Sequence, residues 1–165
     1  MAESNARAPL ALGTGEPAGS STGGNYGWVE CVQRATIPYN ATLTSTANIY
    51  LPYAAGLAWP SGGLYYAAIS EIFVDVITAY NSATSATVSV GKTAGGTEYA
   101  SGVDAKTATG RITPTFTATQ LTNMQKVLQN TVYATVTSVG QPTAGSIVVT
   151  IRYAVCTSQN PYVTS

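Results

Sequence analysis

The sequence predicts an all-β protein: an antiparallel β-sandwich or jelly roll with one short helix and an extended N-terminal arm. Residues that favour strands are frequent, and Tyr alone occurs 11 times in 165 residues. About seven or eight short segments alternate between apolar and polar residues, with Gly and Pro between them, as in sandwiches and jelly rolls. Only one segment has apolar residues at helical spacing.

Two parts are expected: an arm over residues 1–27 and a sandwich domain over residues 28–165. The arm consists largely of Gly, Ser, Pro and Ala without apolar periodicity. Such a segment buries too little apolar surface to offset the entropy lost on ordering. We therefore expect a partner surface to hold it. Its anchors would be its few large apolar groups, Leu10, Leu12, Tyr26 and Trp28.

The domain is expected to open with two strands and a loop. Residues 28–43 begin the folded part, with a strand predicted on 28–37 and a shorter one on 48–53. The loop, 54–63, carries Leu57 and Trp59 at an apolar tip. These two side chains are candidate partner contacts, because aromatic residues are enriched at interface hot spots.

The strongest strand pattern covers residues 64–80. Both of its faces are largely apolar, which predicts a central strand covered on both sides. In 86–91, Val88 and Val90 alternate with Thr and Ser, which predicts a strand with one buried face. The Gly-rich stretch 92–110 should be a loop containing one short strand.

The last strands follow a helix. Pro114 within 111–117 predicts an edge strand, since proline cannot donate to a sheet ladder. Alternation in 132–137 and again in 147–153 predicts a hairpin around the turn 140–145. The polar tail 156–165 is expected to be unpaired.

One helix is predicted over 119–128. Leu121, Met124 and Leu128 fall at helical spacing, so these three should face the core. Thr119 is the candidate N-cap, because its hydroxyl can accept from a free backbone N–H of the first turn.

A single core should join the strands. The alternating patterns assign a common set of side chains to the inward faces. The predicted core comprises Val74, Val76, Val88, Val90, Phe116, Val136, Val149 and Ile151.

Composition argues against catalysis and against nucleic-acid binding. The chain has no His, so Ser-His-Asp and Cys-His mechanisms and most zinc sites are excluded. Seven basic and seven acidic residues give zero net charge, whereas nucleic-acid binders carry a basic surface. We expect no catalytic residue, cofactor or metal. A charge-poor surface promotes association, and a homo-oligomer, trimer or dimer, is expected.

Two local patterns resemble sites but have simpler explanations. Glu71 and Asp75 on one strand would be roughly 13 Å apart, at ~3.3 Å per residue. That exceeds the spacing of about 5–9.5 Å in glycosidases, so each should meet a polar partner, such as Arg152. The Gly-rich segment 91–96 lacks the first glycine of a phosphate-binding loop and is predicted to be a turn.

Two cysteines and the lack of a membrane segment bear on location. No secretory leader or membrane-length apolar run is apparent, which favours a protein made in the cytoplasm and not bound to a membrane. Cys31 and Cys156 are then expected to be small buried hydrophobic residues. The alternative is a disulfide that closes a long loop.

Aromatic residues cluster between the second and third predicted strands. Tyr50, Tyr53, Trp59, Tyr65 and Tyr66 lie within 17 positions of one another. They could cap the core, contact a partner or another subunit, or line a sugar groove. The second possibility makes Tyr65 and Tyr66 candidate partner-binding residues.

Four stretches carry a resemblance to a known family: 88–93, Tyr99-Ala100, Gly110-Arg111 and 143–153. They resemble the small jelly-roll capsid decoration, or cement, proteins of tailed bacteriophages. The resemblance implies a virion protein, made in the host cytoplasm, that binds the major capsid protein on the outer surface of the head and stabilises the shell.

Two other functions compete with capsid decoration. One is a phage tail or fibre component that binds a host receptor. The other is a secreted carbohydrate-binding or pilin-like module. Thr- and Ala-rich strands suit the second alternative, whereas the absence of an apparent leader opposes it.

Overall fold

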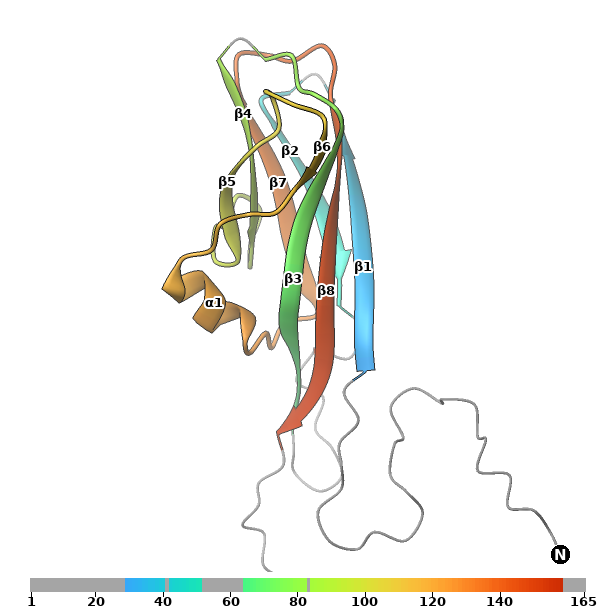
Figure 1. Ribbon diagram of the computed structural model, residues 1–165, viewed down its shortest axis with the longest axis vertical. Coiled ribbons are helices and arrows are strands. Elements are labelled where there is room, and N and C mark those ends of the chain that lie inside the picture. Colours follow the sequence, from blue (N-terminus) through green and yellow to red (C-terminus); the bar gives the residue numbers. More distant parts are fainter. Residues whose placement is uncertain (1–28, 41, 52–63, 83, 159–165) are drawn as a thin grey trace, which may run out of the picture.

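The computed structural model describes residues 29–40, 42–51, 64–82 and 84–158. They form two four-stranded antiparallel sheets that pack as a sandwich, with one short helix at its side (Figure 1). The predicted all-β class and the single short helix are confirmed. In chain order the elements are β1 (Val29–Pro38), β2 (Thr44–Tyr50), β3 (Leu64–Thr78), β4 (Ser85–Gly91), β5 (Ala100–Asp104), β6 (Gly110–Ile112), α1 (Ala118–Met124), β7 (Thr131–Val139) and β8 (Ser146–Ser158).

The strands pair in a nested order. Sheet A has the order β1-β8-β3-β6, and sheet B has the order β2-β7-β4-β5. The first described strand thus pairs with the last, the second with the seventh, the third with the sixth and the fourth with the fifth. Apart from β4 and β5, consecutive strands therefore lie in opposite sheets.

The nested order shows that the predicted final hairpin is wrong. β7 pairs with β2 and β4 in sheet B, whereas β8 pairs with β1 and β3 in sheet A. The chain therefore crosses between the sheets after Val139. Alternation could not reveal this, because a strand with one buried face has the same pattern whether its successor pairs with it or faces it across the core.

Side chains from both sheets meet in one core. Seven of the eight predicted core residues are buried, and only Phe116 is partly exposed. Phe116 lies on the irregular segment after β6, at the margin of the sandwich, where fewer side chains cover it. The confirmed residues are Val74, Val76, Val88, Val90, Val136, Val149 and Ile151.

The expectation that 64–80 is covered on both faces is wrong. In β3 the inward side is fully apolar, but Glu71 and Asp75 lie on the outer side and Ile77 is largely exposed. Phe73 is the one outer residue of this run that is buried. A bulge at Ser70, between the pairs Ile69–Tyr153 and Glu71–Arg152, inserts one residue. The inward-facing residues of β3 therefore have odd numbers before the bulge and even numbers after it.

The helix differs from its prediction in position and in face. Thr117, not Thr119, is the N-cap, and it forms a capping box with Gln120. Gln120 and Met124 are buried, whereas Leu121 and Leu128 are exposed. The amide of Gln120 is accommodated inside because it donates to Thr97 O at 3.0 Å and to Ser101 Oγ at 3.2 Å.

Strand ends were predicted less well than strand centres. The predicted strand 48–53 begins earlier, at Thr44, and the tail is paired as far as Ser158, opposite Leu64. The long β3 supplies that partner, which the polar sequence of the tail does not reveal. The predicted edge strand is confirmed in β6, which ends before Pro114.

Candidate binding surfaces

Most predicted partner-binding residues lie outside the described residues. These are Leu10, Leu12, Tyr26, Trp28, Leu57 and Trp59, and the expected arm and the loop 54–63 lie outside with them. Tyr65 and Tyr66 belong to β3, in register with Thr157 and Cys156 of β8. Tyr66 is partly buried, and the ammonium of Lys126 lies 5.8 Å from its ring centroid. That distance allows a cation–π contact.

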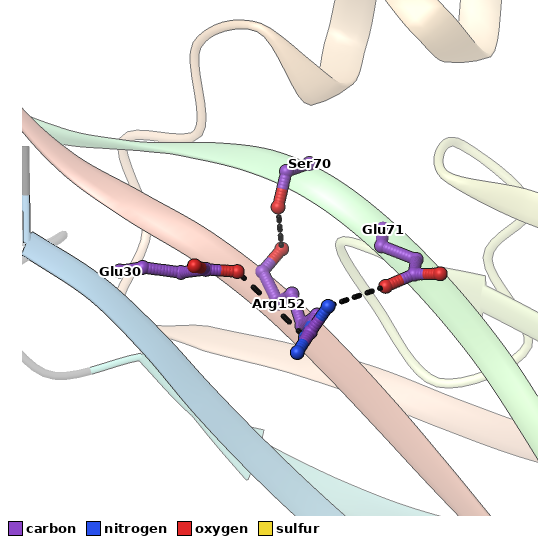
Figure 2. Close-up of polar contacts among 4 residues, drawn as sticks. All are labelled: Glu30, Ser70, Glu71 and Arg152. Atoms are coloured by element: carbon purple, nitrogen blue, oxygen red, sulfur yellow. Dashed lines mark hydrogen bonds and ion pairs between the residues drawn. The ribbon is translucent and has the colours of Figure 1, made fainter.

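The outer face of sheet A carries a charged cluster centred on Arg152 of β8. Its Nη1 lies 3.3 Å from Glu71 Oε2 on β3, and its Nε lies 3.7 Å from Glu30 Oε1 on β1 (Figure 2). Strand register places Arg152 between the two neighbouring strands, directly opposite Glu71 and Val32. The expectation that Glu71 meets a polar partner, with Arg152 as one candidate, is confirmed.

A second cluster on the same face joins β6 to β3. The guanidinium of Arg111 donates to Asp75 Oδ1 at 2.8 Å and to Oδ2 at 3.1 Å. Its carbon also lies 3.9 Å from the ring centroid of Phe73. The hydrogen bond from Arg111 lowers the pKa of Asp75 below its ordinary value. Each carboxylate of the Glu71/Asp75 pair thus has its own arginine.

This second cluster was not found from the sequence. Arg111 and Asp75 are 36 positions apart. They meet because β6 pairs with β3 in the register Asp75–Arg111. Phe73, two positions before Asp75, is covered by the same guanidinium, which explains its burial on an outer face.

The outer face of sheet B is rich in hydroxyl groups over β2, β7 and β4, and it bears the exposed Asp104 on the edge strand β5, in register with Thr87. β2, β7 and β4 contain no Asp, Glu, Lys or Arg. Register aligns Thr44, Thr137 and Thr87 in one row across these strands, and Thr46, Thr135 and Ser89 in the next. Thr135 itself is buried, and its Oγ1 accepts a hydrogen bond from Gly95 N at 2.9 Å. The hydroxyls of Thr46 and Thr135 are 3.1 Å apart. The two faces of the sandwich therefore differ in chemistry: the outer face of sheet A carries two ion-pair clusters, whereas β2, β7 and β4 of sheet B contain hydroxyl groups but no charged side chain.

The segment 91–96 is a turn between β4 and β5, as predicted. Its backbone already binds an anionic group of the chain itself. The N–H of Lys92 donates to Glu98 Oε2 at 2.9 Å, and this bond lowers the pKa of Glu98. A Cβ added to Gly91 or Gly96 would lie 2.4 or 2.5 Å from the same oxygen. The carboxylate thus occupies the position that a bound phosphate would need.

Cys31 is a free thiol at a partly buried site of β1. It lies opposite Tyr153 in the β1–β8 ladder, whereas Cys156 is in register with Tyr66 of β3. Burial raises the pKa of Tyr153, with a smaller contribution from Cys31. The expectation of a fully buried cysteine is therefore wrong for Cys31, and this residue forms no disulfide.

Neither a metal cluster nor a spanning helix is found in the part of the chain that the structure describes. Within it, no three His, Cys, Asp or Glu residues are grouped as metal ligands. Nor is any helix there long and apolar enough to cross a membrane. Comparison with known proteins yields no matching family model, no matching curated protein and no matching solved structure.

Proposed function

We propose that this protein is a capsid decoration protein of a tailed bacteriophage, which binds the outer surface of the head and stabilises the shell. Its partner would be the major capsid protein, and the site of action would be the virion surface. The observation that carries the proposal is the nested strand pairing of the sandwich.

The nested pairing supports a jelly-roll interpretation of the fold. A two-stranded ribbon rolled across two sheets pairs its first strand with its last, as β1 pairs with β8 here. Jelly rolls of eight strands are used by viral capsid proteins and also by lectins and cupins. The stretches behind the phage resemblance fall on this frame, in β4, β5, β6 and β8 and in the loops beside them.

The outer face of sheet B suits docking onto a protein shell. Burying an ionised side chain without a good partner costs several kcal/mol, and no such side chain lies on β2, β7 or β4. Threonine hydroxyls can instead exchange water for backbone groups of the shell at little net cost. Many weak contacts of this kind, linked through an oligomer and an arm, would give avidity.

Binding to empty heads tests this proposal. Heads would be assembled from the major capsid protein of the phage that encodes this chain, without the decoration protein. Co-sedimentation should show saturable binding, and decorated heads should survive higher temperatures. Absence of binding would overturn the proposal, and binding to purified host envelope instead would support a receptor-binding fibre component.

Two threonine substitutions identify the docking face. Thr137→Arg places a charge in the centre of the outer face of sheet B and should weaken binding to heads by roughly tenfold or more, because the charge is buried on docking. Thr78→Arg makes the same change at an exposed position on β3 of sheet A and should bind as the unmodified chain does. The opposite result would assign docking to sheet A.

A further inference from the structure

We propose that two copies of the chain associate through their β1 strands, antiparallel and centred on Val32, so that sheet A continues across a twofold axis. This inference does not depend on the proposed function, because it concerns association of the purified chain in solution. It also leaves the outer face of sheet B free.

β1 is the longest open edge of the sandwich. It has ten residues, lies at one end of sheet A and, among the described strands, pairs only with β8. The strands at the other three sheet ends, β2, β5 and β6, have seven, five and three residues. A long open edge presents unpaired N–H and C=O groups and is a template for another strand.

The backbone pattern identifies which groups point outward. Tyr39 N donates to Gly145 O at 2.9 Å, in continuation of the pair Pro38–Ser146. Hydrogen-bonded pairs alternate in an antiparallel ladder, so the odd-numbered residues of β1 bond to β8. The N–H and C=O groups of Glu30, Val32 and Arg34 therefore point to the open side, where the sheet has no further described strand.

The charges on β1 are self-complementary in one register. If Val32 lies opposite Val32 of the second copy, Glu30 lies opposite Arg34 of that copy, and the twofold axis repeats the pair. A register centred on Glu30 or on Arg34 would instead place like charges opposite each other, which is destabilising. The sequence of the edge thus favours a single pairing.

These side chains are available for such pairing. Val32 is 45% exposed, and no ion pair joins Arg34 to any described residue. Glu30 is 61% exposed, with only the long contact to Arg152 (Figure 2).

Charge reversal tests the pairing. Sedimentation equilibrium of the full chain should show a dimer at micromolar concentration. Glu30→Arg and Arg34→Glu should each raise the dissociation constant by roughly tenfold or more, since each creates two like-charge pairs. The double variant E30R/R34E should restore the dimer. Glu71→Gln is the control: it removes the other ion-pair partner of Arg152, which lies on β3 and not on the edge strand, and it should leave the dimer unchanged.

Cysteine cross-linking tests the register. Val32→Cys places two thiols opposite each other and should give a covalent dimer on mild oxidation, because paired strands bring Cα atoms within disulfide range. Thr36→Cys, on the same face but outside the paired segment, should not exceed the background of the native cysteines. A monomer at all concentrations, single reversals without effect, or stronger cross-linking of the Thr36 variant would each overturn the proposal.

Discussion

Tyr80 and Gly145 join the crossing between β7 and β8 to the rest of the sandwich. The buried Tyr80 hydroxyl donates to Ile37 O on β1 at 3.0 Å, and burial raises its pKa to about 12. Gly145 lies against the tyrosine ring: a Cβ at this position would be 2.5 Å from Cγ of Tyr80. Its backbone φ of +153° is also an angle that L-residues other than glycine rarely adopt.

Gly145→Ala should therefore destabilise the fold by about 2–4 kcal/mol, because strain and overpacking add. Gly102→Ala is the matched control, since Gly102 has a φ of +69° with no atom within 4 Å of an added Cβ. It should cost about 1–2 kcal/mol from strain alone. Urea denaturation of both variants makes the comparison, and equal losses would contradict the packing of Tyr80 on Gly145.

Glu98 should make stability depend on pH. Its pKa is lowered in the folded state, chiefly by the N–H of Lys92. A lowered pKa adds stability above the ordinary value of 4.5, and this stability is lost as the pH falls through the folded value. Glu98→Gln should thus destabilise by about 1 kcal/mol or less at pH 7, since the site is not deeply buried, and by less still at pH 3.

Denaturation of both proteins at pH 7 and pH 3 measures this difference. The substitution keeps the shape of the side chain, and the ion pair of Asp75 with Arg111 is common to both proteins. If the difference in unfolding free energy between the unmodified chain and Glu98→Gln were larger at pH 3 than at pH 7, the stabilising role of the carboxylate would be contradicted.

At the scale of elements, the bulge in β3 allows a test by deletion. Ala67 and Ile69 face the core before Ser70, and Ile72 and Val74 face it afterwards. Removing Ser70 restores strict alternation and leaves all four on the inward side. The deletion should therefore fold, at a cost of about 1 kcal/mol for the lost hydrogen bond from Ser70 Oγ to Arg152 O.

Deletion of Asp75 is the control in the same strand. It shifts the parity of every later residue of β3, so Val76 would face solvent and Ile77 the core. Circular dichroism and thermal unfolding should show a native sandwich for the first deletion and a severely destabilised chain for the second. If the two deletions destabilised the chain equally, Ser70 would not be the residue at which the inward-facing positions of β3 change from odd to even numbers.

At the scale of the whole molecule, the predicted arm allows a test by truncation. Residues 1–24 are largely Gly, Ser, Pro and Ala without apolar periodicity, so deleting them should leave thermal unfolding unchanged, within about 0.5 kcal/mol. The same truncation should bind empty heads more weakly, because a tether raises effective concentration. Unfolding of the truncated chain would instead assign residues 1–24 to the core, and equal head occupancy would contradict the tether.

Local alternation was enough to predict the class of fold and most of the core. Val88, Val136 and Val149 were assigned inward from their own strands, and all three are buried. A strand turns successive side chains to opposite faces wherever it lies, so this part of the prediction needs no partner. A carboxylate on a largely apolar strand also calls for a polar partner, and Arg152, one of the expected candidates, lies beside Glu71.

The tertiary structure alone decided which strands pair and which polar groups meet. β7 and β8 alternate as a hairpin would, yet they lie in opposite sheets. Gln120 is buried in place of Leu121 because Thr97 and Ser101 offer it hydrogen bonds. Alternation is a property of one strand's backbone, whereas pairing depends on the summed packing of distant segments. A single segment therefore shows which of its faces is buried, and only the assembled sandwich determines what that face meets.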